Sequence, residues 1–472
     1  MTKSLSRMHR SITITEGRFN QASREEEMMS DSNPTNTSRR RFLAGSAMAA
    51  GAAASGVSGG ALLKSNTAKA VTTNARIVIA GGGAAGLSIA TRLDRQLDGA
   101  QITVIESRET HLYQPGLTLV ATGIWDEDHV KDRSSRYMPA DANWVKEDVV
   151  AFHPDNNQVE TAGGDRINYD YLVVTTGLQL NFDEIAGMDP SLIGQNGVGC
   201  VYDNPDNASR TWQAADNYIQ NGGVGLFTRP PGPIKCAGAP LKVTMLIEDA
   251  LQDNGTRDQA EMHYLPPGEG LFSQPDIHEF IKTYFPEKRN VAIDWNHPLT
   301  GIDAANQRAT FTTPEGDRTV DYDFIHVVPP MSAPDMIRYG DLGWQDGDFQ
   351  GWMEVDQYSM QHRRYPNVFG AGDVVGTPVG KTAASVKAQA PVVADNLVAA
   401  IEEREFPMEW TGYTSCPLIT EKGQAMLVEF DFSLEMTPSF DFLNPFEPQW
   451  APWFLKERML HAAYNAMLRG RV

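Results

Sequence analysis

A lone cysteine lies in an unusual turn near the middle of the chain. Cys236 belongs to Arg229-Pro-Pro-Gly-Pro-Ile-Lys-Cys-Ala-Gly-Ala-Pro-Leu-Lys242, directly after the apolar run Gly223–Thr228. Such a run predicts a buried strand, and nucleotide-binding folds usually hold phosphate in the turn that follows. Proline has no N–H to offer a phosphate. This turn therefore favours thiol chemistry over dinucleotide binding.

The surroundings of Cys236 make it a candidate nucleophile. It precedes a predicted helix, Leu241–Leu251, and Lys235 and Lys242 flank it. A helix N-terminus and nearby cations lower the pKa of a thiol, and the thiolate is the reactive form. The alternative is a small buried hydrophobic residue, but the glycines and prolines around Cys236 favour close approach of another group.

The chain has only two other cysteines. Cys416, in Gly412-Tyr-Thr-Ser-Cys-Pro-Leu-Ile-Thr420, is predicted to lie in a turn-like segment and is a second catalytic candidate. Its alternative role is a structural disulfide with Cys236. Cys200 is a weaker catalytic candidate, because a core thiol explains it as well. The cysteines lack C-x-x-C spacing and the histidines form no i, i+4 pair, so no metal site is predicted.

A dinucleotide fingerprint begins the ordered part of the chain. The predicted strand Arg76–Ala80 is followed by Gly81-Gly-Gly-Ala-Ala-Gly86, a helical pattern over Leu87–Leu97, and a second strand, Gln101–Ile105, that ends at Glu106. G-x-G-x-x-G thus lies between strand and helix, with an acid about 20 residues beyond it. The pattern predicts a pyrophosphate at the helix N-terminus and a ribose at Glu106. The candidate cofactor-binding residues here are Gly81, Gly83, Ala84, Ala85, Gly86 and Glu106.

Three later segments favour FAD as the cofactor. Tyr169–Gly177 is an apolar strand that ends in Thr-Thr-Gly, and Tyr365–Asp373 resembles the second flavin motif of two-dinucleotide flavoproteins. Lys381–Pro391 predicts a helix whose N-terminus would stabilise anionic reduced flavin. The candidate flavin-binding residues in these segments are Thr176, Gly177, Gly372, Asp373 and Lys381.

Strand and helix signals recur between the two flavin segments, as expected for a domain inserted into the first. We therefore predict an α/β fold with two Rossmann-like domains of the FAD/NAD(P)-binding type, the second inserted into the first, plus a C-terminal amphipathic membrane or interface region. The predicted parts are an N-terminal segment (1–70), the FAD-binding domain (71–180 and 331–405), the second Rossmann-like domain (181–330) and a C-terminal redox-cysteine and membrane-interface region (406–472).

The N-terminal segment predicts disorder followed by an export signal. Ser38-Arg-Arg-Arg-Phe-Leu43 opens a weakly apolar run that ends in Ala68-Lys-Ala70, a cleavage pattern. This arrangement resembles a twin-arginine signal and predicts a periplasmic or extracytoplasmic protein. A retained anchor is the alternative, although the run is poor in large apolar residues. The net charge of -20 over 472 residues argues against nucleic acid as a partner.

With both cysteines placed beside an FAD fold, the chain resembles the sulfide:quinone oxidoreductases. The most specific matches are Pro231–Pro240, His326–Pro334 and Gly412–Leu418. The resemblance implies a redox pair at Cys236 and Cys416, bridged by a disulfide or trisulfide beside FAD. It also implies that sulfide is the substrate, that a further molecule accepts the sulfur and that membrane quinone accepts the electrons. Peripheral membrane attachment is implied as well, and a homo-oligomer is compatible with the resemblance. An export signal departs from many members of the family.

The C-terminal run Pro452–Leu468 is rich in aromatic and aliphatic residues but too short to span a bilayer. We expect it to lie in the membrane interface, with an ordinary core or dimer helix as the alternative.

Lys242 is expected to favour the Cys236 thiolate.

Three other functions stay open at this point. One is a flavoprotein sulfide dehydrogenase that donates electrons to a cytochrome c. Another is a type-II NADH:quinone dehydrogenase, which the prolines of the second turn disfavour. The last is a redox-sensing or carrier flavoprotein that uses FAD structurally.

Overall fold

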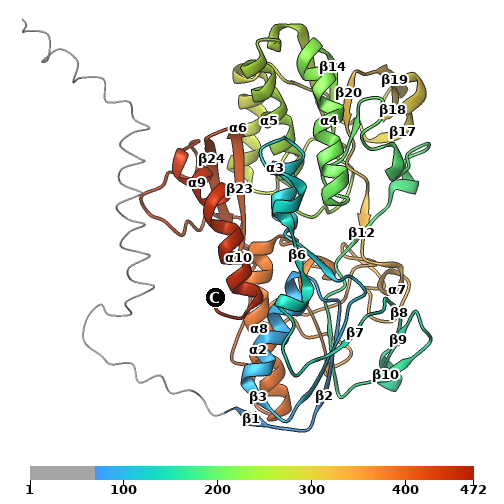
Figure 1. Ribbon diagram of the computed structural model, residues 1–472, viewed down its shortest axis with the longest axis vertical. Helices are drawn as coiled ribbons and strands as arrows, with labels where there is room; N and C mark the ends of the chain where they lie inside the picture. Colours follow the sequence, from blue (N-terminus) through green and yellow to red (C-terminus); the bar gives the residue numbers. More distant parts are fainter. Residues whose placement is uncertain (1–69) are drawn as a thin grey trace, which may run out of the picture. The chain divides into compact units, whose positions relative to one another are not determined.

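The computed structural model describes residues 70–472, so the predicted disorder and export signal lie outside the described residues. Two parallel sheets organise this part of the chain (Figure 1). The first has the strand order β22-β11-β2-β4-β7 and the second the order β13-β20-β14-β15-β16. Every strand of the second sheet comes from the segment between β11 and β22, which confirms the predicted insertion of one Rossmann-like domain into the other.

The first sheet is built from short apolar strands. Its central strand is buried along nearly its whole length, as expected for a parallel strand covered on both faces. Helix α2 follows it and packs with α8. The bounds are β2 (Arg76–Ala80), α2 (Ala84–Gln96), β4 (Gln101–Ile105), β7 (Asn143–Val145), β11 (Tyr171–Val174), β22 (Val368–Gly370) and α8 (Ala383–Ile401).

The second sheet alternates with helices, two of which, α4 and α6, begin at side-chain caps. The Asn204 side chain accepts from the N–H of Asn207 at the start of α4, and Pro205 occupies the first turn. The bounds are β13 (Val198–Gly199), α4 (Pro205–Asn221), β14 (Gly223–Thr228), α5 (Ala239–Asn254), β15 (Ala260–Leu265), α6 (Pro275–Lys288), β16 (Ala292–Ile293) and β20 (Phe324–His326).

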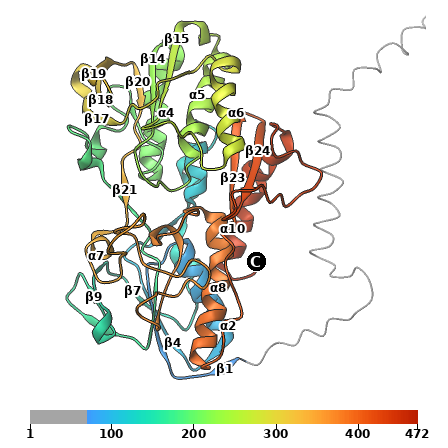
Figure 2. The ribbon, with the colours of Figure 1, turned by 180° about the vertical axis from the view of Figure 1, so that it is seen from behind.

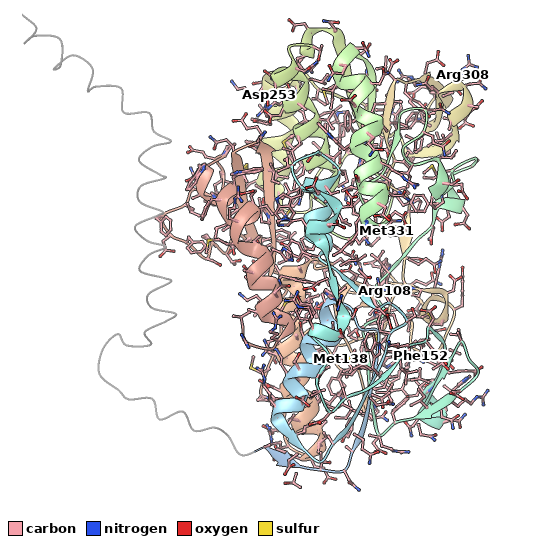
Figure 3. The ribbon with its side chains drawn as sticks, viewed as in Figure 1. Arg108, Met138, Phe152, Asp253, Arg308 and Met331 are labelled. Atoms are coloured by element: carbon pink, nitrogen blue, oxygen red, sulfur yellow. The ribbon has the colours of Figure 1, made fainter. Side chains whose placement is uncertain are left out.

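Two short strands carry the chain into and out of the inserted domain. β12 (Gln179–Leu180) pairs antiparallel with β21 (Met331–Ser332), so the two connections support each other. Figure 3 shows Met331 in the middle of the molecule, between the two sheets. The smaller elements are two antiparallel meanders and short pieces: β1 (Val71–Thr72), β3 (Leu97–Asp98), β5 (Thr110–Leu112), α3 (Leu117–Val120), β6 (Lys131–Arg133), β8 (Val149–His153), β9 (Gln158–Thr161), β10 (Arg166–Asn168), β17 (Leu299–Asp303), β18 (Arg308–Thr313), β19 (Gly316–Asp321) and α7 (Asp335–Arg338).

The C-terminal region consists of a hairpin and a broken helix. β23 (Thr414–Glu421) pairs with β24 (Gln424–Phe430) and packs on α5. The final helix has an α-helical start, α9 (Trp450–Phe454), a π-helical turn (Leu455–Met459) and an α-helical end, α10 (Leu460–Leu468). α10 lies against α2 (Figures 1 and 2). Among the described residues, no helix has the length and apolar character needed to cross a bilayer.

A buried ion network fixes the hairpin on the second domain. Glu248 of α5 is fully buried and accepts from Arg257 at 3.1 Å and from Arg289 at 2.9 Å. Arg289 also pairs with Glu421 at the end of β23, with 2.5 Å between Nη2 and Oε2. The end of β23 is therefore held to α5 through the buried Glu248–Arg289 pair, whose outer partner Glu421 is partly exposed.

We predict that Glu248→Gln destabilises the folded protein by about 3–5 kcal/mol, because it takes the anion from Arg257 and leaves the buried Arg289 with only the partly exposed Glu421. Urea unfolding followed by tryptophan fluorescence measures the loss. The matched control is Glu269→Gln, an exposed site where the change should cost less than about 0.5 kcal/mol. Equal costs at the two sites would contradict the role given to this network.

Candidate functional site

Cys236 and Cys416 meet in space although they are far apart in the sequence. Lys242, on the first turns of α5, points its ammonium group at both. Its Nζ lies 3.4 Å from Cys236 Sγ and 3.8 Å from Cys416 Sγ. Lys242 is only 2% exposed and Cys416 is buried, whereas Cys236 is half-buried. The structure thus brings together two predicted cysteines and one predicted lysine.

The prediction that Cys416 lies in a turn-like segment was wrong. Cys416 is the third residue of strand β23 and pairs with Val428 of β24. The strand has one free edge, which tolerates Pro417, a residue that donates no backbone hydrogen bond. Strand alternation turns the Cys416 side chain, like that of Leu418, towards the protein interior.

The backbone of the Cys236 loop is held in a specific conformation. Cys236 has φ +46°, a left-handed geometry that costs a residue other than glycine about 1–2 kcal/mol. Its N–H donates to the carbonyl of Lys381 (2.9 Å), and its carbonyl accepts from the Tyr202 hydroxyl (3.2 Å). These contacts hold the loop against the start of α8, on the other Rossmann-like domain.

Gly238 makes room for the second thiol. A side chain at Gly238 would place its Cβ 2.5 Å from Cys416 Sγ, which is shorter than any van der Waals contact. The glycine in the Pro-Gly-rich loop is therefore required by the approach of β23, as the sequence suggested for this loop in general.

The two thiols have different acidities. A hydrogen bond from the Cys416 thiol, together with the Lys242 and Lys456 ammonium groups, holds the pKa of Cys236 well below its usual value despite burial. That same bond and burial raise the pKa of Cys416. Burial lowers the pKa of Lys242, but the two sulfurs outweigh it and raise the pKa overall. The pair therefore loses its first proton easily at Cys236 and its second with difficulty.

Lys456 is a site residue that sequence reasoning missed. It lies on the π-helical turn of the C-terminal helix, is 2% exposed and donates to the carbonyl of Pro115. Burial and the charge of Lys242 lower its pKa to about 7. In the sequence Lys456 stands beside Glu457 and Arg458, and nothing marks it as the buried one. Only the π turn, which shifts the helix face by one residue, turns it inward.

Cys200 is not brought to the pair. It is fully buried, and its sulfur accepts from the N–H of Tyr202 at 3.5 Å. Burial raises its pKa to about 12, so it stays a neutral thiol. Its surroundings favour a core thiol, the alternative given for it above.

The glycine turn after β2 has the geometry of a cofactor cradle. Gly81 has φ +103°, and a side chain there would collide with the carbonyl of Thr175. A side chain at Gly83 would meet nothing within 4 Å, so space is open in front of α2. α2 begins at Ala84 without a side-chain cap, and Ala85 and Gly86 form its first turn. Its first N–H groups are therefore available to a pyrophosphate.

Two other features of this edge fit FAD. The buried hydroxyl of Thr176 has no hydrogen-bond partner among the described residues, and nothing lies within 4 Å of a side chain built at Gly177. The Asp373 carboxylate accepts no hydrogen bond within residues 70–472, and burial raises its pKa. These unpaired groups are what a ribityl and phosphate chain would use, so the residues fit bound FAD.

The side chains of Glu106 and Lys381, both predicted to bind the cofactor, already form hydrogen bonds within the protein. Glu106 accepts from the N–H of Gly82 (3.0 Å) and from Arg108 (2.9 Å), whose position Figure 3 shows. The Lys381 ammonium donates to the carbonyls of Asp373 and Val375 and lies 3.5 Å above the ring of Trp352. Burial lowers its pKa to about 7. The α8 N-terminus begins at Ala383, and the Gly372 N–H donates to Gln389.

In the second phosphate turn, backbone N–H groups that could hold a phosphate already contact other protein groups. Besides the N–H of Cys236, the N–H of Lys235 contacts Met331 Sδ at 3.3 Å and that of Ala239 donates to the Cys236 carbonyl at 2.7 Å. Three N–H groups are engaged within the protein, and the three prolines have none. This turn therefore has few backbone donors left for a phosphate.

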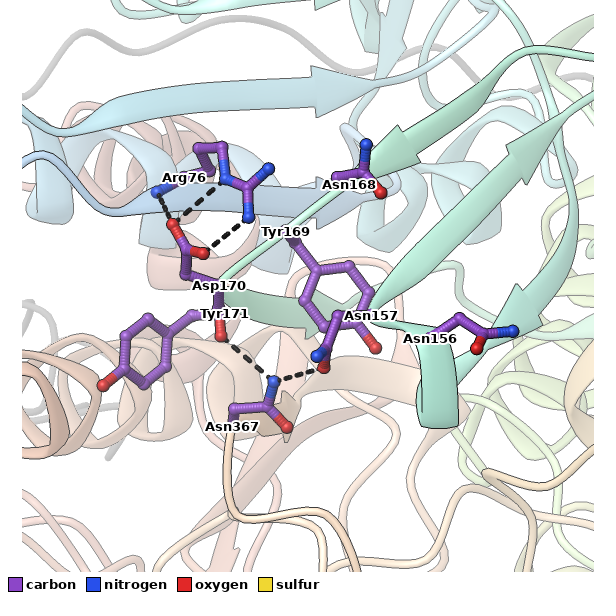
Figure 4. Close-up of a pocket in the computed structure, with 8 residues that line it drawn as sticks. All are labelled: Arg76, Asn156, Asn157, Asn168, Tyr169, Asp170, Tyr171 and Asn367. Atoms are coloured by element: carbon purple, nitrogen blue, oxygen red, sulfur yellow. Dashed lines mark hydrogen bonds and ion pairs between the residues drawn. The ribbon is translucent and has the colours of Figure 1, made fainter.

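A surface depression lies elsewhere on the first domain. It holds about 360 Å³, and Arg76, Asp170 and Asn367 lie along it (Figure 4). Arg76 pairs with Asp170 at 2.7 Å, and the depression includes none of the predicted site residues. It adds nothing to the thiol and cofactor site.

Comparison with known proteins agrees with this geometry. A family model described as pyridine nucleotide-disulphide oxidoreductase matches residues 75–217. The mitochondrial sulfide:quinone oxidoreductase of Dictyostelium discoideum is 36% identical over 82% of this chain and 84% of its own. The mouse (Mus musculus) mitochondrial enzyme is 32% identical over 82% and 85%. The crystal structure of the sulfide:quinone oxidoreductase from Aquifex aeolicus has the same fold, with a TM-score of 0.68 and 19% identity over 84% of this chain and 92% of that one.

The glycine cradle, the inserted second domain and the two thiols around one buried ammonium thus occur in a chain that these two mitochondrial enzymes match over 82% of its length. At 32% and 36% identity, these relatives show that the chain belongs to the sulfide:quinone oxidoreductase family.

Proposed function

We propose that the protein oxidises sulfide at Cys236 and Cys416 and passes the electrons through FAD to a membrane quinone. The observation that carries this proposal is the Lys242 ammonium within 3.8 Å of both sulfurs. A buried cation between two thiols stabilises a thiolate wherever the bond between them opens. The relatives named sulfide:quinone oxidoreductase support sulfide as donor and quinone as acceptor.

In the oxidised protein a disulfide would join the two cysteines. Hydrosulfide attacks Cys416 Sγ, the sulfur–sulfur bond breaks, and Cys236 leaves as a thiolate beside Lys242. Cys416 then carries the persulfide. An acceptor thiolate removes its outer sulfur as a persulfide and leaves Cys416 as a thiolate. Re-forming the disulfide from the two thiolates releases two electrons, which balances the oxidation of one sulfide.

FAD, when bound, supplies the two-electron acceptor next to the pair. The α2 N-terminus and Thr176 would hold its phosphate and ribityl parts. The closed second turn argues against NADH as the donor, since its N–H groups are already used.

We also propose that the C-terminal region rests on a membrane surface. Phe442, Phe446 and Met459 are 59%, 41% and 40% exposed and all belong to this region. Glu429, which is buried, accepts from Tyr413 and from the Ser439 N–H, and so fastens the loop that carries the phenylalanines. Exposed aromatic side chains on a fastened loop suit the lipid interface, from which a quinone would enter.

Export and oligomeric state are further parts of the proposal that the described residues do not carry. Export by the twin-arginine route to the periplasmic side rests on Ser38–Leu43, outside the described residues. A homo-oligomer stays a prediction.

The central test uses the FAD-loaded protein under anaerobic conditions. Sulfide should bleach the flavin absorbance, and a soluble ubiquinone should restore it faster than cytochrome c does. Cys236→Ser should lower sulfide-dependent quinone reduction by at least about a hundredfold, since no thiolate can leave. Retained activity in this variant would refute the mechanism. Faster oxidation by cytochrome c would instead favour a sulfide dehydrogenase.

Removing the central charge should change the pH dependence of the thiol. With the pair reduced, Cys236 of the wild type should react with iodoacetamide at a lower pH than an ordinary thiol does, because its pKa is lowered. Lys242→Met removes one cause of that shift, so the inflection of the alkylation rate should move to higher pH. Lys387→Met, at an exposed site, is the control and should leave the inflection in place. An unchanged inflection in Lys242→Met would show that Lys242 does not hold the thiolate.

One fractionation experiment tests export and membrane attachment separately. Changing Arg39, Arg40 and Arg41 to Lys should keep the protein in the cytoplasm of a host with the twin-arginine translocase. Phe442→Asp combined with Phe446→Asp should leave export intact but move the protein from the membrane pellet to the soluble periplasmic fraction. Unchanged pelleting of the second variant would place the membrane contact elsewhere.

A further inference from the structure

Two ammonium groups, those of Lys242 and Lys456, are buried beside the thiol pair. Each side chain is 2% exposed. Neither forms an ion pair with a carboxylate within residues 70–472, although a buried cation needs an anionic partner. The groups whose negative charge acts on both are the sulfurs of Cys236 and Cys416. The charge balance of the site therefore depends on the state of the two sulfurs.

The packing of α9 brings Lys456 to this place. Trp453 of α9 lies in one buried cluster with Leu246 of α5 and Ile419 of β23. Leu246 is one helical turn beyond Lys242, so α9 rests on the two elements that carry the rest of the site. Lys456 follows Trp453 by three residues, and its charge acts on both sulfurs.

The site has hydrogen-bond donors to spare. An ammonium group has three N–H donors, and within the described residues that of Lys456 donates only to the carbonyl of Pro115. The Lys242 ammonium contacts the two sulfurs, at 3.4 and 3.8 Å. Helix α5 begins at Ala239 without a side-chain cap and adds the partial positive charge of its N-terminus. Positive charge and unused donors thus gather around the sulfurs.

The buried Asp373 carboxylate does not supply the missing partner. It acts on Lys235 and Lys381, and no carboxylate is among the groups that act on Lys456. Burial also raises the pKa of Asp373, which favours its neutral form.

Closing the bond between the two sulfurs removes their negative charge. Two thiolates give one disulfide and two electrons, which pass to FAD in the proposed reaction. A disulfide is neutral and its sulfurs are weak acceptors, so both ammonium groups lose their anionic partner. A buried cation in that position either gives up its proton or takes an anion from solution.

A small ion can approach the sulfurs from the Cys236 side. Cys236 and its neighbours Lys235 and Ala237 are partly exposed, and the preceding segment Pro231–Pro233 is exposed. The ammonium groups themselves are shielded from water, which strengthens their attraction for an anion.

We propose that the oxidised site binds one small monovalent anion beside Lys242 and Lys456, and that hydrosulfide enters as this anion. The proposal rests on the proposed function, because it needs the bond between Cys236 and Cys416. Attack of hydrosulfide on Cys416 Sγ forms one sulfur–sulfur bond, breaks the other and leaves Cys236 as the thiolate. One negative charge is present before and after the attack, and the same two ammonium groups stabilise it throughout.

Chloride binding to the FAD-loaded protein tests the site without turnover. Chloride is the probe, and exchange with bound ion broadens its NMR signal. The oxidised wild type should broaden the signal more than wild type whose pair has been reduced with a dithiol and desalted without oxygen, because the Cys236 thiolate then takes the place of the ion. Equal broadening in the two redox states would mean an adventitious ion only and would overturn the proposal.

Variants assign the binding to Lys456. Lys456→Met should remove most of the difference between the redox states, since it deletes one of the two charges. The matched control is Lys288→Met, at an exposed position at the end of α6, which should keep the difference. Flavin absorbance checks that both variants hold FAD. An undiminished difference in Lys456→Met would overturn the role of this lysine.

Stopped-flow reduction of the flavin by sulfide tests whether hydrosulfide uses the same site. At constant ionic strength kept with gluconate, chloride should raise the half-saturating sulfide concentration of wild type and leave the limiting rate unchanged. Lys456→Met should raise that concentration at least about tenfold and abolish its response to chloride. Lys288→Met should change it by less than about twofold.

The outcomes separate this proposal from the function on which it rests. Wild-type sulfide dependence in Lys456→Met, or chloride that lowers only the limiting rate, would overturn the entry of hydrosulfide at this site. If sulfide did not reduce the flavin of the wild type at all, the proposed function would fail, whereas the chloride difference between the redox states would still support an anion site.

Discussion

The Lys242 ammonium is the interaction on which the site depends. A charge that is 2% exposed costs several kcal/mol unless an opposite charge or strong acceptors lie beside it. The two sulfurs supply them, and in return the ammonium stabilises the Cys236 thiolate and helps to lower its pKa. Neither partner is stable there alone, so cation and thiolate are coupled. Any motion that separates the hairpin from α5 would break this coupling.

The rest of the chain keeps that triangle closed. The Cys236 N–H bonds to Lys381 and so ties the loop to the FAD-binding domain. Glu248 and Arg289 hold the end of β23 against α5. The C-terminal helix brings a second ammonium, Lys456, towards the same sulfurs. Three regions of the chain therefore meet at one buried site. Met459, part of the surface proposed to touch lipid, lies on the same π-helical turn as Lys456.

Much of the fold could be predicted because local patterns specify it. The strand after Arg76, the glycine turn and the strand Gly223–Thr228 follow from apolar runs and from glycines that no other residue could replace. Cys416 could not be assigned to a strand, because the segment holds a proline next to it and the strand that pairs with it comes later in the sequence. Lys456 could not be found at all, since its burial comes from one π-helical turn between two charged neighbours.

The sequence by itself determined the two Rossmann-like domains and the cofactor cradle, and it pointed to Cys236 as the candidate for thiol chemistry, because each depends on residues close together in the chain. Only the tertiary structure decided which groups share the site. It joined Cys416 and Lys456 to Cys236 and left Cys200 in the core. The physical reason is that burial and charge coupling depend on distance in space, and sequence patterns record neighbours only along the chain.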